Sequence, residues 1–137
     1  MVRKITLEQV EGIVKKVINE SVYEGLSMED MLKGINYIGG NLAYEMNDRE
    51  ELYDSVSKED TNFLWMIADG LYAKWVEKLM TGQTSLAQMN KWTPEKIEEN
   101  MKETFDRLKR IYQKDFKDIK VFSGNDHPKW IDTILGL

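Results

Sequence analysis

Residues 60–81 read DTNFLWMIADGLYAKWVEKLMT, and this stretch decides the fold. Its apolar side chains recur at spacings of three and four, which is the period of an α-helix. They cover more than half of a helical wheel, an arc typical of a helix that contacts neighbours on several sides. The sequence therefore predicts one long central helix over 60–81 that ends at Gly82, with Leu71 near the middle of its buried arc.

Helical signals continue on both sides of this stretch. Three explicit helix starts are present: the capping box Thr6-Leu7-Glu8-Gln9, Ser27 followed by Asp30, and Thr93-Pro94-Glu95. The predicted helices cover residues 6–22 with a stop at Gly25, 27–46, 50–56, 93 to about 115, and 128–135. The expected fold is an all-α single domain over residues 1–137, a bundle of four to six helices around the helix at 60–81.

Three glycines interrupt the predicted second helix, at Gly34, Gly39 and Gly40. A glycine inside a helix costs about 1 kcal/mol relative to alanine, so each needs a reason. Close approach of another helix, or a break at Gly39-Gly40, are the structural explanations. A ligand pressed against bare backbone is the functional one, but no phosphate-loop signature accompanies these glycines.

The helix that begins at Thr93 has a narrower apolar stripe and charged side chains spaced four residues apart. Such pairs predict a solvent-exposed outer helix: Glu98–Lys102, Glu103–Arg107 and Asp106–Arg110. Residues 119–122 alternate as a strand would, but the sequence offers no partner strand. We therefore expect an extended segment or a fraying helix end there.

Composition excludes several classes of function. The chain has 137 residues, no cysteine and one histidine, so disulfides, thiolate chemistry and multi-histidine metal sites are excluded. No apolar run approaches the roughly 20 residues of a membrane span, and no signal peptide is recognisable, so we expect a cytoplasmic protein that does not enter membranes. The net charge of −5 disfavours general nucleic-acid binding.

An acidic segment follows the second helix. Residues 48–60 hold six acids and two bases, with Tyr44 before the segment and Tyr53 inside it. An acidic rim around aromatic anchors is typical of a surface that binds a basic partner. The predicted partner-binding residues are Tyr44, Asp48, Glu50, Glu51, Tyr53 and Asp54.

The same acids offer an alternative. Glu51 and Asp54 share one helical face, as in all-α nucleotide hydrolases that bind Mg²⁺ through carboxylates. Asp69 or Glu77 would have to complete the site from the long helix. The doubled acidic motif of such enzymes is missing, so we predict no metal and no cofactor, and this hydrolase is the second hypothesis.

A basic stretch over 107–120 supports a third hypothesis, nucleic-acid binding. Cations at helical spacing can follow a phosphate backbone, and this stripe consists of Arg107, Arg110, Lys114 and Lys117. Cations late in a helix also favour the helix dipole, which explains them without a ligand. The overall acidic charge places this hypothesis below the other two.

The remaining candidates are a histidine and scattered aromatic residues. His127 lies in a Gly-Asn-Asp-His-Pro turn, where we expect an exposed side chain without a catalytic role. Tyrosine and tryptophan outside the core are enriched at binding hot spots. Here these are Tyr37, Tyr44, Tyr53, Trp92 and Trp130. The leading hypothesis is therefore a non-enzymatic domain that inhibits, neutralises or adapts a partner protein, in the manner of bacterial immunity and phage accessory proteins.

Overall fold

A computed structural model describes residues 22–82, 92–119, 121–122 and 127–137 of the chain, and within them the only regular elements are helices. These are α2 (Met28–Asp48), α3 (Glu50–Ser55), α4 (Lys58–Ala68), α5 (Leu71–Thr81), α7 (Pro94–Ile111), the π-helical turn η1 (Tyr112–Phe116) and α8 (Lys129–Leu135). The all-α prediction is confirmed. The helix predicted over 6–22 lies outside the described residues. No helix among those described is long and apolar enough to cross a bilayer.

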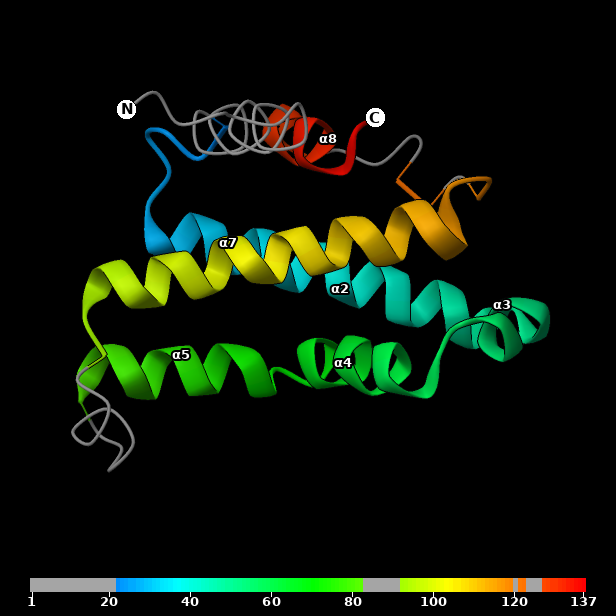
Figure 1. Cartoon of the computed structure of the whole chain (residues 1–137), viewed down its shortest axis with the longest axis horizontal. Coiled ribbons are helices and arrows are strands. Elements are labelled where there is room, and N and C mark those ends of the chain that lie inside the picture. Colours follow the sequence, from blue (N-terminus) through cyan, green and yellow to red (C-terminus); the bar gives the residue numbers. More distant parts are fainter. Residues whose placement is uncertain (1–21, 83–91, 120, 123–126) are drawn as a thin grey trace, which may run out of the picture.

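Helix α2 forms the centre of the bundle (Figure 1). It begins as predicted, because the Ser27 hydroxyl accepts from the Asp30 amide at 3.1 Å while the Asp30 carboxylate accepts from the Ser27 amide at 3.3 Å. It packs against α3, α4 and α7. Its apolar stripe is wholly buried: Met31, Ile35, Ile38, Leu42, Ala43 and Met46. The core is therefore organised around α2 and not around residues 60–81.

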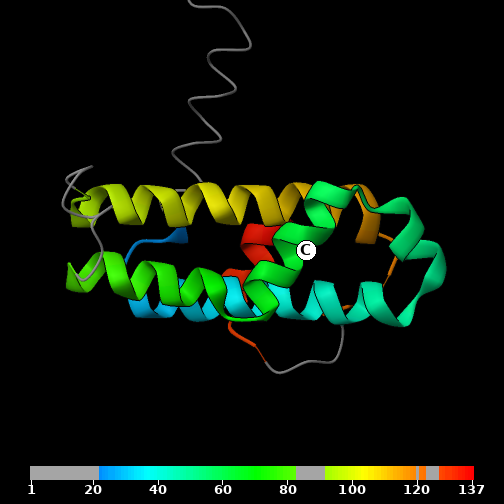
Figure 2. The ribbon, with the colours of Figure 1, turned by 90° about the horizontal axis from the view of Figure 1, so that it is seen from below.

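The single helix predicted over 60–81 is wrong. The chain ends α4 at Ala68 and begins α5 at Leu71, and Gly70 between them adopts a left-handed backbone with φ 78°. Glycine enters this conformation without steric cost, so it allows the chain to turn. Figure 2 shows α4 crossing at an angle to the axis of α5. The turn changes which side faces the core, and Leu71 is 54% exposed.

Helix α7 starts where predicted, since the Thr93 hydroxyl accepts from the Lys96 amide at 3.2 Å and Pro94 occupies the first turn. It is not an outer helix, however, because α2, α5 and α8 all pack against it. Among the described residues only one of the three predicted i,i+4 pairs forms, Glu98–Lys102 at 3.6 Å. Arg107 turns instead toward α4.

Two of the three glycines of α2, Gly34 and Gly39, are places of close approach. A Cβ at Gly34 would overlap the Trp130 indole of α8, and one at Gly39 would press on Ile67 of α4. Helix α2 runs unbroken through Gly39 and Gly40, so the alternative of a break there is wrong. Residues 121 and 122 bury their side chains without forming a strand.

Candidate functional site

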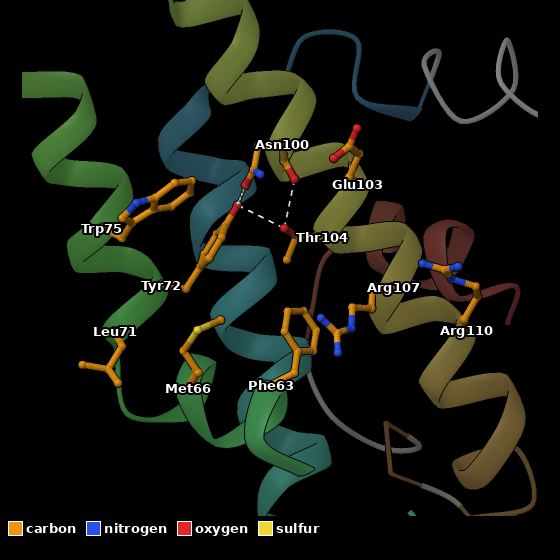
Figure 3. Close-up of a pocket in the computed structure, with 10 residues that line it drawn as sticks. All are labelled: Phe63, Met66, Leu71, Tyr72, Trp75, Asn100, Glu103, Thr104, Arg107 and Arg110. Atoms are coloured by element: carbon orange, nitrogen blue, oxygen red, sulfur yellow. Dashed lines mark hydrogen bonds between the residues drawn. The ribbon is translucent and has the colours of Figure 1, made fainter. Parts of the chain in front are cut away.

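One hollow in the described chain is a groove between α7 on one side and α4 and α5 on the other. It encloses about 600 Å³, and Figure 3 shows its walls. Aromatic and aliphatic side chains come from α4 and α5, and polar and charged ones from α7. The lining residues are Phe63, Met66, Leu71, Tyr72, Trp75, Asn100, Glu103, Thr104, Arg107 and Arg110. We call it the α5–α7 groove.

A hydrogen-bonded bridge crosses this groove (Figure 3). The Tyr72 hydroxyl donates to Oδ1 of Asn100 at 2.7 Å. The Thr104 hydroxyl lies 3.1 Å from the Tyr72 oxygen and 2.9 Å from the Asn100 carbonyl oxygen, and it can donate to either. Burial raises the pKa of Tyr72 above its usual value, more than the Thr104 contact lowers it, so the phenol stays protonated. The groove therefore has a fixed floor whose polar groups are paired.

Arg107 joins the two walls at one end of the groove. Its guanidinium carbon lies 4.0 Å from the centre of the Phe63 ring, within cation–π range. Its Nη2 also lies 3.5 Å from a carboxylate oxygen of Asp60. These two contacts hold the arginine at the rim, where its side chain remains 40% exposed. Arg110, one turn further along α7, is exposed.

Aromatic rings extend the groove toward the start of α7. Tyr72 and Trp75 have ring centres 5.8 Å apart, and Trp75 meets Trp92 edge-on at 5.3 Å. A second hollow, of about 460 Å³, adjoins the first through Asn100 and Glu103 and adds Trp92, Lys96 and Glu99. The indole Nε1 of Trp92 is buried without a hydrogen-bond acceptor among the described residues. Together the two hollows follow α7 from Lys96 to Arg110.

Sequence reasoning missed most of this groove. The helical wheel over 60–81 places Phe63, Leu71, Tyr72 and Trp75 on one buried arc, whereas the turn at Gly70 leaves part of that arc at the surface. The available signal was Asp69-Gly70, a pair that commonly stops a helix. Two residues of the predicted basic stripe, Arg107 and Arg110, lie on the groove. The other two, Lys114 and Lys117, are exposed in and just after η1.

The predicted acidic surface is exposed as expected. Tyr44 is 63% and Tyr53 50% exposed, and the Tyr44 ring meets Trp65 edge-on at 6.3 Å. Asp48, Glu50, Glu51 and Asp54 are also exposed, at the end of α2 and on α3. The described residues contain no group of three or more acids or histidines that could hold a metal ion. Glu51 and Asp54 are thus not brought together with Asp69 or Glu77.

The expectation of an exposed His127 is wrong. Only 7% of its side chain is exposed, because the ring lies between α2 and α8. Its Nε2 is 2.6 Å from Oδ1 of Asp132, and its Nδ1 is 3.1 Å from the Tyr37 hydroxyl. A carboxylate only accepts, so Nε2 carries a proton, and in the neutral ring Nδ1 accepts from Tyr37. The histidine thus connects α8 to α2 through hydrogen bonds. It also lines a hollow of about 430 Å³ together with Trp130.

No protein-family model, curated protein or solved structure matches this chain.

Proposed function

We propose that this chain is a protein-binding domain and that the α5–α7 groove is its binding surface. One observation carries the proposal: Trp75, Tyr72 and Arg107, the residue types most enriched at binding hot spots, line one open groove. Leu71 is exposed at its edge, where a partner would cover it. An apolar centre with a charged rim is the usual anatomy of a protein interface.

The groove is also pre-organised. The Tyr72–Asn100–Thr104 hydrogen bonds and the Arg107–Phe63 contact fix its side chains before a partner arrives. Less conformational entropy is then lost on binding, which favours affinity. A small domain with such a surface suits the role of an inhibitor or adaptor that acts in the cytoplasm, as immunity proteins and phage accessory proteins do.

The acidic surface around Tyr44 and Tyr53 is a second candidate contact for the same function. Both rings are exposed, and the exposed carboxylates of Asp48, Glu50, Glu51 and Asp54 are near them in the sequence. These negative charges would steer a partner with a basic surface. A hollow of about 590 Å³ adjoins this surface at Glu50 and Glu51, but no aromatic side chain lines it, whereas Phe63, Tyr72 and Trp75 line the groove. We therefore place the groove first.

The proposal is tested by photo-crosslinking in the native host. A photoreactive phenylalanine analogue replaces Leu71 at the groove, Tyr53 on the acidic surface, or Lys129 on α8, which is exposed away from both. Mass spectrometry identifies the attached proteins. We expect a defined adduct from position 71 that the second change Arg110→Glu removes. Adducts from position 53 or 129 with none from 71 would show that the groove is not the binding surface.

A further inference from the structure

The walls of the α5–α7 groove determine what kind of partner backbone can enter it. Both walls are helices, and beyond the first turn of each wall the main-chain amides and carbonyls bond within their own helix. The described residues contain no strand, and hence offer no sheet edge to pair with an extended peptide. A partner backbone buried here has to satisfy its own hydrogen bonds. An α-helix does so.

The length of the groove fits such a helix. The lining residues on α7 run from Lys96 to Arg110, a distance of about 21 Å at 1.5 Å per residue. A helix of about 14 residues covers that length in four turns. Its apolar side chains at positions i, i+3 or i+4, and i+7 would face Met66, Tyr72 and Trp75.

The rim charges differ between the two ends of the groove. Arg107 and Arg110 stand at the end nearer Phe63, and Glu103 and Glu99 toward the end nearer Trp92. Lys96 lies beside Glu99 and offsets part of its charge. Asp60 offsets part of the charge of Arg107 in the same way, so Arg110 is the main positive group at its end, and it selects a partner with acidic side chains there.

We propose that the groove binds an amphipathic α-helix of a partner protein, with its apolar stripe on the aromatic floor and acidic residues against Arg107 and Arg110. This inference rests on the proposed function and adds the class of partner to it. One added helix that lies over the groove, in contact with both α5 and α7, repeats the packing of helices already present in the bundle.

The probe is a displayed library of 16-residue peptides, which is selected for binding to the full chain. Half of the peptides are designed as helices with randomised surface positions. The other half carry proline at alternate positions and cannot form a helix. We expect the selected peptides to come from the helical half, with apolar residues at i, i+3 or i+4, and i+7 and acids near one end. Arg110→Glu should weaken their binding about tenfold, which corresponds to ~1.4 kcal/mol. Lys114→Glu makes the same charge change on an exposed residue outside the groove and should have less than about a twofold effect.

Rescue distinguishes a direct contact from general charge repulsion. Replacement of the peptide's acids by lysine should restore binding to the Arg110→Glu protein and weaken binding to the original. Circular dichroism of each variant verifies that it folds. Selection of the proline-containing peptides, still sensitive to Arg110→Glu, would overturn the helical partner but leave the groove as a protein-binding surface. Failure of every peptide to bind, or binding indifferent to Leu71→Glu and Arg110→Glu, would overturn the proposed function itself.

Discussion

The indole of Trp130 on α8 lies directly against the backbone of Gly34 on α2, where any side chain would overlap it. The same indole meets the Phe105 ring of α7 edge-on at 5.7 Å. One side chain thus closes the junction of three helices, and it does so only because position 34 carries no Cβ. The glycine that weakens α2 locally is what allows α8 to dock.

Gly34→Ala should therefore destabilise the protein by about 1–3 kcal/mol, the usual cost of adding volume to a packed site. Gly40 lies in the same helix with open space where its Cβ would be. Gly40→Ala should accordingly stabilise by about 0.5–1 kcal/mol, because alanine is the better helix former. Urea denaturation of both variants measures the two effects. Equal shifts of the same sign would show that the Trp130 contact is not the reason for Gly34.

A pair of leucines tests where the core lies. Leu64 on α4 is fully buried, whereas Leu71 at the start of α5 is 54% exposed. Leu64→Ala should cost about 2–5 kcal/mol, the range for a buried leucine. Leu71→Ala should stay within about 0.5 kcal/mol, as a surface change does. The free energies of unfolding of the two variants decide between the turn at Gly70 and one continuous helix. In a continuous helix, Leu71→Ala would destabilise the protein as much as Leu64→Ala.

His127 offers a test of how α8 is held. The ring bridges Asp132 on α8 and Tyr37 on α2, so His127→Ala removes two hydrogen bonds at a buried site. We expect a loss of about 1–3 kcal/mol. Hydrogen exchange of the α8 amides should accelerate more than that of α2, because α8 is the element released. Lys129→Ala changes an exposed residue of α8 and serves as the control. Uniform acceleration over all helices would contradict a local fastening role.

Helix starts were predictable from the sequence because they depend on local chemistry. The Ser27 hydroxyl accepts from the Asp30 amide and the Thr93 hydroxyl from the Lys96 amide, so both caps form within four residues and need no tertiary partner. Two glycines of α2, Gly34 and Gly39, also indicated close packing correctly, whereas Gly40 has open space beside it. The contacts of the first two, Trp130 and Ile67, lie far away in the chain and had no local signature.

The groove and the buried histidine were not predictable for the same physical reason. A helical wheel over 60–81 assumes one straight axis, and the left-handed turn at Gly70 divides it. Arg107 had a suitable partner four residues away in Glu103, yet it pairs with Asp60 and stacks on Phe63 of α4. His127 looked like an isolated turn residue because Tyr37 is 90 positions away. For Arg107 and His127, tertiary contacts decide among partners that local spacing leaves equally possible, whereas the turn at Gly70 had a local signal in Asp69-Gly70.

A partly buried carboxylate in η1, that of Asp115, sets a pH dependence. One oxygen of Asp115 is buried without a hydrogen-bond partner among the described residues. This burial, together with the nearby charge of Asp60, raises the pKa of Asp115 above its usual value, while Lys114 lowers it. A pKa raised in the folded state means that folding favours the protonated acid. The associated stability is present below the unfolded pKa of about 3.9 and is lost as the pH rises through the folded value.

Asp115→Asn removes that titration while keeping nearly the same shape. The variant should be more stable than the original protein at pH 7 by about 0.5–2 kcal/mol, the range of single stabilising substitutions. The gain should shrink as the pH falls toward 4, because the original aspartate becomes protonated there and regains its stability. Urea denaturation at several pH values between 4 and 7 follows the difference. Asp118→Asn, an exposed neighbour, should give a much smaller change over the same range. A gain for Asp115→Asn that is constant across the pH range would show that burial of its charge is not the cause.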